Sequence, residues 1–515
     1  MPPSWEDLSP YGSLVNTSSV EPRAYQISIT KSLFSGRNTL IVLPTGLGKT
    51  LIAVFAIARA LHMGRKALIL APTRPLNEQH YKSMSELLNI DRGEILLLTG
   101  SIKGSNRMKM EEAARVIVAT PQTFSNDLKS GRISMDDFGI VIFDECHRAV
   151  GRYAYTYIAE ECRTRGVQVI GLTASPGSDR KKINALVAAL GIQSIEMRIS
   201  TDPDVAPYVM RKDVRNMMVE TGKTISTIME VIRPLIEEHL MNLYSHGLSP
   251  FKDFRNMPKG RLLQIGDAIR KIEAQNYRFM GMYNYIYVLN LSHAYDLAAC
   301  EGIYPFVNYI ESLEQRENKS RTLKGLLANK AVMSAKGIAK EALDKGEEHP
   351  KMLKIADMLK GELKDDSAII FAQFRSTTRQ ITDVLKRNGI EAREFVGKKA
   401  GITQQHQQET IGAFRDGHFR VLVATSIGEE GLDIPTVDTV IFYEPIPNEI
   451  RNIQRRGRAG RMKYGRIFIM VAKGTKDEAY LFISMHREMK MRDNLLKAKM
   501  ALESGWGGRT GQKRL

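Results

Sequence analysis

The strongest constraint on this 515-residue chain is an apolar run that leads into a glycine-bearing loop and then into a helical pattern. Residues 39–43 read TLIVL, the loop ends at Lys49 and Thr50, and residues 51–58 are again apolar. Such a loop presents backbone N–H groups to phosphate oxygens, while its Lys neutralises charge and its hydroxyl holds Mg²⁺. The first glycine of the common eight-residue pattern is replaced by Leu43. We expect nucleotide phosphates to contact Leu43, Pro44, Thr45, Gly46, Leu47, Gly48, Lys49 and Thr50.

Another apolar run, residues 140–143, delivers the acidic pair Asp144 and Glu145 at its end. Ligands bind at this end of the strands in open α/β sheets. Asp144 is expected to hold Mg²⁺ together with Thr50, and Glu145 to orient and deprotonate an attacking water. Taken alone, the pair could also be the exposed start of a helix, where acidic groups are favoured. His147 is expected to hydrogen-bond across the nucleotide cleft.

Two stretches of the chain alternate short apolar runs with helical patterns, as parallel sheets buried on both faces do. The runs are residues 39–43, 67–70, 95–98, 116–119, 140–143 and 167–172, then 368–371, 421–424, 439–443 and 467–471. Between the two stretches, helical periodicity takes over. We predict an α/β protein with a nucleotide-binding domain at 1–205, a helical insertion at 206–346, a second α/β domain at 347–495 and a flexible basic tail at 496–515.

The second α/β stretch carries an arginine-rich segment, residues 454–461 (QRRGRAGR). This segment could be a solvated basic turn or a nucleic-acid patch. The stretch has no phosphate loop of its own, however, and ATP hydrolysis requires positive charge on the transferring phosphate. We assign Arg458 and Arg461 as charges that reach the phosphate from this facing domain, and Gln454 and Arg455 as contacts in the cleft.

Small hydroxyl-bearing or basic residues follow several of the other apolar runs. They suit either turn capping or contacts with a phosphate–sugar backbone, and the sequence leaves both open. The candidates for nucleic-acid contact are Pro72, Thr73, Arg74, Thr99, Gly100, Thr120, Pro121, Gln373, Arg375, Thr425 and Ser426. Farther along the last of these segments, Gly431 and Asp433 are candidates for nucleotide contact, since Asp433 can accept a hydrogen bond from a ribose hydroxyl or from an arginine.

The chain carries a formal net charge of +17, which points to a polyanionic partner, although a basic proteome would produce the same bias. Its three cysteines have no metal-ligand spacing and indicate a reducing compartment. No apolar run is long enough to span a membrane, and the N-terminus does not read as a signal peptide. We expect a soluble cytoplasmic protein with no membrane contact.

Taken together, these segments resemble a superfamily-two helicase with a DECH box. The resemblance rests on residues 23–26 (RAYQ), 44–50, 144–147 (DECH), 173–175, 425–433 and 454–461, in the order the family has them. It implies two RecA-like domains, ATP and Mg²⁺ in the cleft between them, and nucleic acid across the opposite face. It also implies that Arg23 and Gln26 contact the adenine base.

The helical insertion narrows the resemblance to the archaeal Hef helicases, the Fanconi anaemia group M translocase and the RIG-I/Dicer ATPases. The local amino-acid sequence is most similar to that of Hef, as in residues 428–435 (GEEGLDIP) and 453–458 (IQRRGR). This resemblance implies a translocase for forked or branched DNA, associated with the nucleoid of an archaeal cell, with a sliding clamp or a separate nuclease as possible partners. An ATPase stimulated by double-stranded RNA is the alternative. No Glu-Arg-Lys nuclease signature appears, so we predict no nuclease activity.

Two features of the insertion leave alternatives open. Its many Lys and Arg residues would grip duplex DNA by the family comparison, or form a solvated face balanced by Glu residues. Its aromatic cluster could stack on bases, but neighbouring apolar residues favour core packing. The cluster consists of Tyr277, Phe279, Tyr283, Tyr285 and Tyr287.

Overall fold

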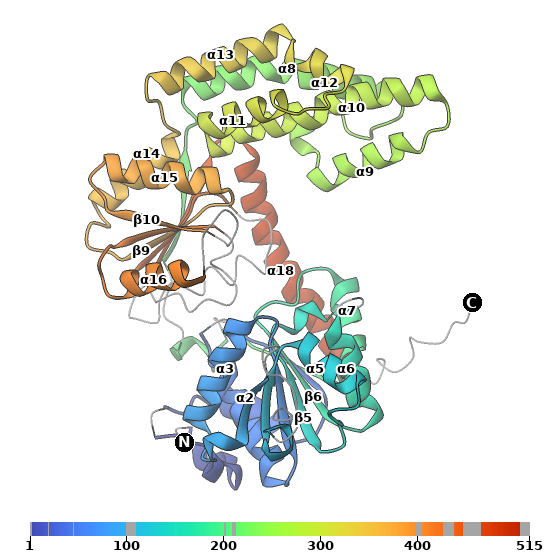
Figure 1. The fold of residues 1–515 in the computed structure, drawn as a ribbon, viewed down its shortest axis with the longest axis vertical. Helices are drawn as coiled ribbons and strands as arrows, with labels where there is room; N and C mark the ends of the chain where they lie inside the picture. Colours follow the sequence, from blue (N-terminus) through green and yellow to red (C-terminus); the bar gives the residue numbers. More distant parts are fainter. Residues whose placement is uncertain are drawn as a thin grey trace.

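The computed structural model describes residues 3–504 with several internal gaps. The gaps are residues 19, 45, 99–109, 150, 152, 200–201, 209–212, 397–403, 426–436 and 446–464, and the side chains of 256, 259, 404 and 488. Two α/β domains lie one above the other, with a helical unit at the far end of the upper one (Figure 1). The predicted fold class, two parallel-sheet domains with a helical insertion, is confirmed.

The first domain is built on a seven-stranded parallel sheet with the order β3-β4-β2-β5-β6-β1-β7. Its strands are β1 (Thr39–Val42), β2 (Lys66–Leu70), β3 (Ile95–Leu98), β4 (Val116–Ala119), β5 (Phe138–Phe143), β6 (Gln168–Thr173) and β7 (Ser194–Met197). The helices are α1 (Ala24–Leu33), α2 (Lys49–His62), α3 (Arg74–Leu87), α5 (Pro121–Lys129), α6 (Ala154–Thr164) and α7 (Arg180–Ala189). Separate apolar cores lie on the two faces of this sheet.

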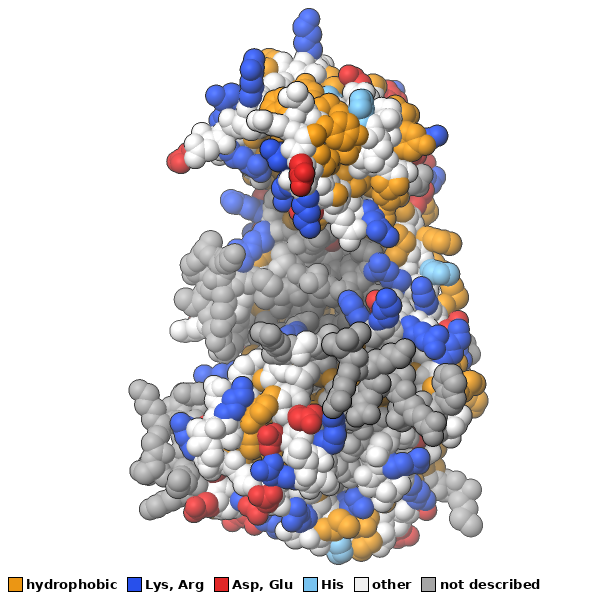
Figure 2. Space-filling model, turned by 90° about the vertical axis from the view of Figure 1, so that its right-hand side faces the viewer, with side chains coloured by type: hydrophobic (Ala, Val, Ile, Leu, Met, Phe, Trp, Pro, Cys, Tyr) orange, Lys and Arg blue, Asp and Glu red, His pale blue; other side chains and the backbone are white. Residues whose placement is uncertain are grey.

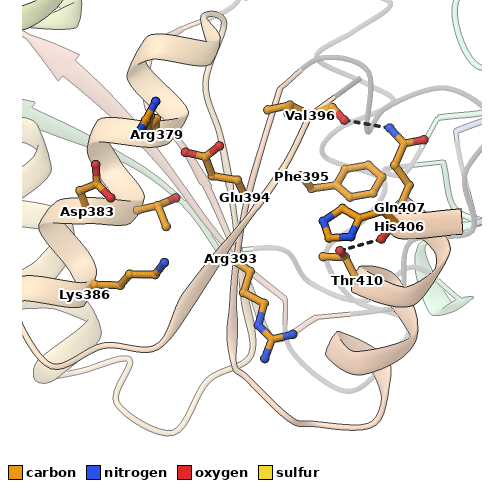
Figure 3. A pocket seen from close by; sticks show the side chains of 11 residues that line it. Arg379, Asp383, Lys386, Arg393, Glu394, Phe395, Val396, His406, Gln407 and Thr410 are labelled. Carbon is orange, nitrogen blue, oxygen red and sulfur yellow. Dashed lines mark hydrogen bonds between the residues drawn. The ribbon is translucent and has the colours of Figure 1, made fainter. Parts of the chain in front are cut away.

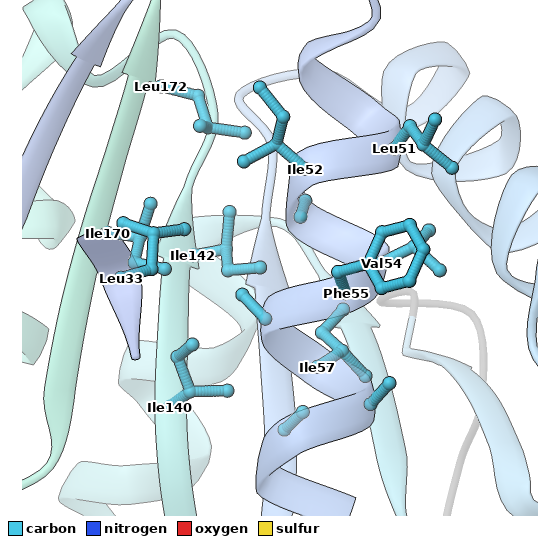
Figure 4. Close-up of a cluster of buried hydrophobic side chains, with 14 of the residues drawn as sticks. Leu33, Leu51, Ile52, Val54, Phe55, Ile57, Ile140, Ile142, Ile170 and Leu172 are labelled. Carbon is cyan, nitrogen blue, oxygen red and sulfur yellow. The ribbon is translucent and has the colours of Figure 1, made fainter. Parts of the chain in front are cut away.

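Helix α2 is apolar on most of its circumference because it is buried between the sheet and the surrounding helices. Ile52 and Phe55 belong to the core shared with Ile142 of β5 and Ile170 of β6 (Figure 4). Strand β1 is buried along its whole length and pairs with β6 on one side and β7 on the other. The loop that follows β1 is therefore held between a central strand and a buried helix.

The second domain has a six-stranded parallel sheet with the order β10-β11-β9-β12-β13-β8. Its strands are β8 (Asp213–Val219), β9 (Ala368–Phe371), β10 (Ala392–Phe395), β11 (Val421–Ala424), β12 (Thr439–Phe442) and β13 (Arg466–Ala472). The helices are α14 (Pro350–Lys360), α15 (Arg375–Arg387), α16 (Gln404–Arg415) and α18 (Lys476–Glu503). Strand β8 was predicted to belong to the helical insertion. It is an edge strand, mostly exposed, and lacks the continuous apolar run of a strand buried on both faces.

The helical unit therefore interrupts the second domain, between β8 and β9, rather than separating the two domains. It consists of α8 (Lys223–Ser245), α9 (Lys259–Arg270), α10 (Gln275–Asp296), the π-helical turn Leu297–Glu301, α11 (Ile303–Glu314), α12 (Arg321–Leu327) and α13 (Lys330–Asp344). These helices share one core. Tyr285 and Tyr287 are buried in it, as core packing predicts, whereas Tyr277, Phe279 and Tyr283 are exposed.

The last helix, α18, leaves the second domain and ends against the first (Figure 1). Its residues 496–503 were predicted to be part of a flexible tail, but Ala498 and Leu502 pack on the core of the first domain. The rest of that predicted tail lies outside the described residues. Among the described helices, none has the length and apolar content needed to cross a membrane.

Candidate nucleotide site and sheet edges

The glycine-bearing loop lies between β1 and the first turn of α2, as its sequence predicts. Gly46 and Gly48 both have positive φ angles, 84° and 71°, which favour glycine over any other residue. Gly48 also lies so close to Gln26 that a Cβ atom would come within 2.3 Å of Gln26 Nε2. The backbone at these positions can therefore approach a ligand where a side chain could not.

The side chain of Lys49 lies within the loop itself. Its Nζ donates to the carbonyl oxygen of Leu43 at 2.9 Å and approaches that of Pro44 at 3.5 Å. Desolvation by burial lowers the pKa of Lys49, while the carboxylates of Glu145 and Asp144 oppose this change. Thr50 follows in the first turn of α2, and Thr45 lies outside the described residues.

Residues from α1 cover the other side of the loop. The hydroxyl of Tyr25 donates to Leu47 O at 2.8 Å, and Nε2 of Gln26 donates to the same oxygen at 3.3 Å. Arg23 donates to Tyr25 Oη at 3.2 Å, and its guanidinium lies 5.5 Å from the ring centroid of Tyr208. The structure thus brings Gln26 directly to the phosphate loop and Arg23 to Tyr25, which itself contacts the loop.

Asp144 follows β5 and is held on three sides. Its Oδ2 lies 2.8 Å from His80 Nε2, its backbone N–H donates to Leu70 O, and its carbonyl oxygen accepts from the Tyr155 hydroxyl at 2.7 Å. Burial raises the pKa of Asp144, but the hydrogen bond and charge of His80, together with Lys49, bring that pKa below its usual value. The carboxylate is therefore kept ionised, as a cation ligand must be.

Glu145 has a φ of 48° and a ψ of 44°, a left-handed conformation that is unfavourable for a residue with a Cβ atom. Its Oε2 lies 3.3 Å from His147 Nδ1, and that nitrogen lies 3.2 Å from Oγ1 of Thr173 at the end of β6. His147 therefore joins the two strand ends, one on each side of the site. Both contacts lie within the first domain, so the hydrogen bond of His147 across the nucleotide cleft stays a prediction.

Two buried oxygen atoms at this site test whether a nucleotide fits. Gln26 Oε1 has no hydrogen-bond partner within the described part of the chain, and Glu145 Oε2 lies within ion-pair distance of His147 Nδ1 but accepts no hydrogen bond there. Buried polar atoms are normally satisfied, so a ligand with donors, such as an adenine amino group or a water molecule, suits these positions. Mg²⁺ in phosphate sites keeps several waters and takes one or two protein oxygens, which matches Thr50 and Asp144. The residues present fit ATP and Mg²⁺.

The predicted nucleic-acid contacts that the structure describes also lie at carboxyl ends of strands. Thr73 and Arg74 follow β2, Thr120 follows β4 and Thr425 follows β11. Thr120 caps α5, with Thr123 N donating to its Oγ1 at 3.4 Å, so it has the capping role that the sequence left open. Pro72 precedes Thr73, Pro121 is the buried first residue of α5, and Gln373 and Arg375 lie at the start of α15.

Several predicted site residues lie outside the described residues, so the structure does not place them. They are Thr45, Thr99, Gly100, Ser426, Gly431, Asp433, Gln454, Arg455, Arg458 and Arg461.

The second domain has a separate cavity of about 420 Å³ at its sheet edge. Side chains from α15, β10 and α16 line it, including Arg379, Lys386, Arg393 and Glu394 (Figure 3). These residues come from the edge strand and its two flanking helices, not from the segments that follow β1 and β5. This cavity is therefore distinct from the nucleotide site.

Lys and Arg side chains recur along the underside of the helical unit and across the middle of the molecule (Figure 2). Many basic residues of the unit nevertheless have acidic partners. Arg255 pairs with Asp253, Arg270 with Asp267, Lys336 with Glu314, Lys340 with Glu311 and Lys345 with Glu341. The balanced surface predicted as an alternative is thus present for this part of the insertion.

Known proteins share both sequence and architecture with this chain. The DEAD/DEAH box helicase family matches residues 23–183, and the helicase conserved C-terminal domain matches residues 350–463. The crystal structure of the Pyrococcus furiosus Hef helicase domain matches with a TM-score of 0.73 and 39% identity, covering 92% of this chain and 100% of that one. This chain belongs to the Hef group of superfamily-two helicases. It carries both domains of an ATP-hydrolysing helicase.

Longer relatives match over part of their length. A putative ATP-dependent RNA helicase of Methanocaldococcus jannaschii is 37% identical over 94% of this chain and 62% of its own. The ATP-dependent DNA helicase MPH1 of Pyricularia oryzae is 33% identical over 89% of this chain and 44% of its own. The chain thus spans 62% and 44% of the length of these two relatives.

His80 and Tyr155 are site residues that the sequence did not reveal. Each lies within a helix, α3 or α6, and reaches Asp144 only through the fold. A single His or Tyr on an otherwise ordinary helix carries no local signal. The position of α3 after β2, the strand beside β5, is the one feature that could have suggested His80.

Proposed function

We propose that this helicase uses ATP to move along branched or forked DNA. The observation that carries the proposal is the likeness to the Hef helicase domain over that domain's whole length, including the helical unit that projects from the second domain. The helical unit is proposed to grip duplex DNA, and such an element beside two ATP-driven domains suits a substrate with more than one arm. Contacts with the phosphate–sugar backbone of DNA carry little information about its base sequence, so recognition would depend on the structure of the DNA.

In the proposed reaction, the loop from Gly46 to Thr50 holds the phosphates of ATP, and Lys49 moves from Leu43 O to the terminal phosphates. Gln26 and Arg23 contact the adenine base. Thr50 and Asp144 would hold Mg²⁺, which would supply charge neutralisation for the transferring phosphoryl group. Glu145 accepts a proton from the attacking water, and His147 holds the Glu145 carboxylate in place.

The second domain would complete the site. Arg458 and Arg461 are proposed to stabilise charge on the transferring phosphate, with Gln454, Arg455, Gly431 and Asp433 as further cleft contacts. Binding of ATP would draw the domains together and hydrolysis would release them, so that alternating grip moves the protein along one strand. The candidate residues at the strand ends that were named above, the first of which is Pro72 and the last Ser426, are proposed to contact the nucleic-acid backbone.

A second candidate is an ATPase stimulated by double-stranded RNA, because the M. jannaschii relative is named as a putative RNA helicase. The two candidates predict opposite preferences in one experiment. ATP turnover is measured with a fork, a Holliday junction, single-stranded DNA and double-stranded RNA at equal nucleotide concentration. We expect the fork or the junction to stimulate most; a larger response to double-stranded RNA contradicts the DNA proposal.

The same reactions test the expectation that the chain has no nuclease activity. With Mg²⁺ present, labelled strands released from the fork are expected to keep their full length on a denaturing gel, and shortened strands would contradict this. We further propose that the protein acts in the cytoplasm at the nucleoid, with a sliding clamp or a separate nuclease as a possible partner.

A further inference from the structure

Helix α18 touches all three parts of the molecule. At its N-terminus, Asp477 accepts a hydrogen bond from the buried Lys351 at 2.9 Å, and Lys476 pairs with Asp296 of the helical unit. Its first turn contacts the end of β13 in the second domain, where Ala472 N donates to Asp477, and its C-terminal half contacts α7 and β7 of the first domain (Figure 1). One continuous helix therefore connects the helical unit and the second domain to the nucleotide-binding domain.

In the first domain, α18 meets the segment that follows β6. The hydroxyl of Ser175 donates to the thioether sulfur of Met491 at 2.9 Å, and the side chain of Asn494 donates to Ser178 O at 2.9 Å. Met491 and Leu495 are part of the apolar core beneath this segment. These contacts join residues that are 316 positions apart in sequence.

The same segment reaches the proposed catalytic base through short contacts. Thr173 Oγ1 accepts from Ser175 N at 3.1 Å, and His147 Nδ1 lies 3.2 Å from that Thr173 oxygen. His147 Nδ1 in turn lies 3.3 Å from Glu145 Oε2. An unbroken series of contacts thus runs from α18 through Ser175, Thr173 and His147 to Glu145.

We propose that Met491 and Asn494 are positioning residues for ATP hydrolysis, which hold the segment from Thr173 to Ser178 and so place His147 beside Glu145. Through them, α18 conveys the position of the second domain and the helical unit to the hydrolytic site. The inference rests on the proposed function, because it assumes that Glu145 is the base. A shift of about 1 Å in a supporting residue is enough to slow an enzymatic step considerably.

The helix provides its own matched control. Met489 lies two residues before Met491 but is 61% exposed, against 8% for Met491. We expect Met491→Ala and Asn494→Ala to lower kcat of DNA-stimulated hydrolysis by about tenfold or more while KM for ATP changes little, because they displace the base rather than the phosphate loop. Met489→Ala should leave both constants unchanged, and Met491→Leu, which keeps the volume but not the sulfur that accepts from Ser175, should retain more of kcat than Met491→Ala.

A merely structural role for Met491 would give a different result. It would reduce the number of folded molecules, measured as the stoichiometry of ATP binding, and leave kcat per binding site unchanged. That outcome, or equal loss of kcat in the Met489 variant, overturns the proposal.

Hydrogen exchange separates failure of this inference from failure of the proposed function. The amide of Ser175 is expected to exchange faster in Met491→Ala than in Met489→Ala, whether or not the protein turns over ATP. Unchanged exchange at Ser175 overturns the positioning role. An absence of ATP turnover in the unmodified protein would instead overturn the proposed function and leave the exchange result standing.

Discussion

Glu145 is the one non-glycine residue, within the described part of the chain, that has a positive φ. Such a conformation costs roughly 1–2 kcal/mol for a residue with a Cβ atom and is often found at functional sites. The conformation places a carboxylate between Lys49 and His147, with one oxygen buried and available. Strain at this residue is consistent with a position set by chemistry rather than by stability.

Replacing Glu145 by Gln removes the proposed base and keeps the shape of the side chain. We expect ATP turnover to fall by at least about 100-fold while ATP binding persists, because general-base catalysis contributes about that much or more. A fluorescent ATP analogue measures the binding. Glu160→Gln is the control, since Glu160 lies on the surface and pairs with Arg163. Turnover retained by the Glu145 variant would remove the assignment.

Gly48 offers a test of the contact between α1 and the phosphate loop. In Gly48→Ala, the added Cβ would come within 2.3 Å of Gln26 Nε2, so Gln26 must leave Leu47 O. Gly64→Ala is the control, because Gly64 has the same φ of 71° but nothing within 4 Å of the added atom. Both variants should lose about 1 kcal/mol of stability from backbone strain, but only Gly48→Ala should also weaken ATP binding. Equal ATP affinity in the two would refute the contact.

At the scale of elements, the predicted strands were those buried on both faces. Residues 39–42, 95–98 and 421–424 read as continuous apolar runs and are β1, β3 and β11. The sequence analysis missed β7, β8 and β10, which are three of the four edge strands; the fourth, β3, is mostly buried and apolar and was predicted. A strand with one neighbour needs less apolar surface, and its polar residues resemble those of loops.

The site likewise contains residues that could be predicted from the sequence and residues that could not. The site residues that belong to short continuous motifs, Leu43 to Thr50 and Asp144 to His147, were identified from the sequence. His80 and the contacts of α18 with Ser175 depend on packing between elements far apart in the chain, and no short pattern carries that information. The end of α18 was missed because residues 496–515 contain glycines and basic residues that suggest a tail.

The N-cap of α14, His349, is a buried histidine whose hydrogen bonds fix its neutral form. His349 Nε2 lies 3.1 Å from Ala299 O, and Nδ1 accepts from Lys351 N at 3.1 Å. Burial, and then the charge of Lys351, lower the pKa of His349 to about 3. Because this pKa is depressed, the contribution of neutral His349 to the stability of the folded state is complete above about pH 6.5. It is lost progressively as the pH falls toward 3.

We therefore expect His349→Asn to flatten the loss of stability below pH 6.5, because Asn can still cap α14 but cannot take up a proton. The free energy of unfolding in urea, measured at pH 5 and pH 7.5, is the test. The free energy of unfolding should differ less between pH 5 and pH 7.5 in the variant, by about 1 kcal/mol or more. Each pH unit below the pKa of the unfolded state changes this free energy by about 1.4 kcal/mol. An unchanged difference would contradict the role of His349.

At the scale of the whole molecule, the formal net charge of +17 belongs to the full chain, and part of it falls on residues outside the described ranges. Several cations of the helical unit pair with carboxylates, so only part of the charge is available for phosphates. Binding through phosphates alone depends steeply on salt and weakly on sequence.

We expect the affinity for a forked DNA to fall by about a thousandfold between 50 and 200 mM salt if six or more phosphates are contacted. Two forks of the same shape and different sequence should bind equally at each salt concentration. Fluorescence anisotropy measures both. Lys340→Ala, which removes a cation already paired with Glu311, should leave the salt dependence unchanged. A clear preference for one sequence would contradict recognition through the backbone.

The two α/β domains are proposed to share one hydrolytic site, and Arg458→Ala tests this most directly. Arg458 belongs to the second domain, whereas Lys49 and Glu145 belong to the first. In fork-stimulated hydrolysis, we predict that Arg458→Ala lowers kcat by about a thousandfold with little change in ATP binding, while Arg379→Ala, on the distant cavity of the second domain, has no effect. A normal rate in the Arg458 variant would show that the first domain hydrolyses ATP without it.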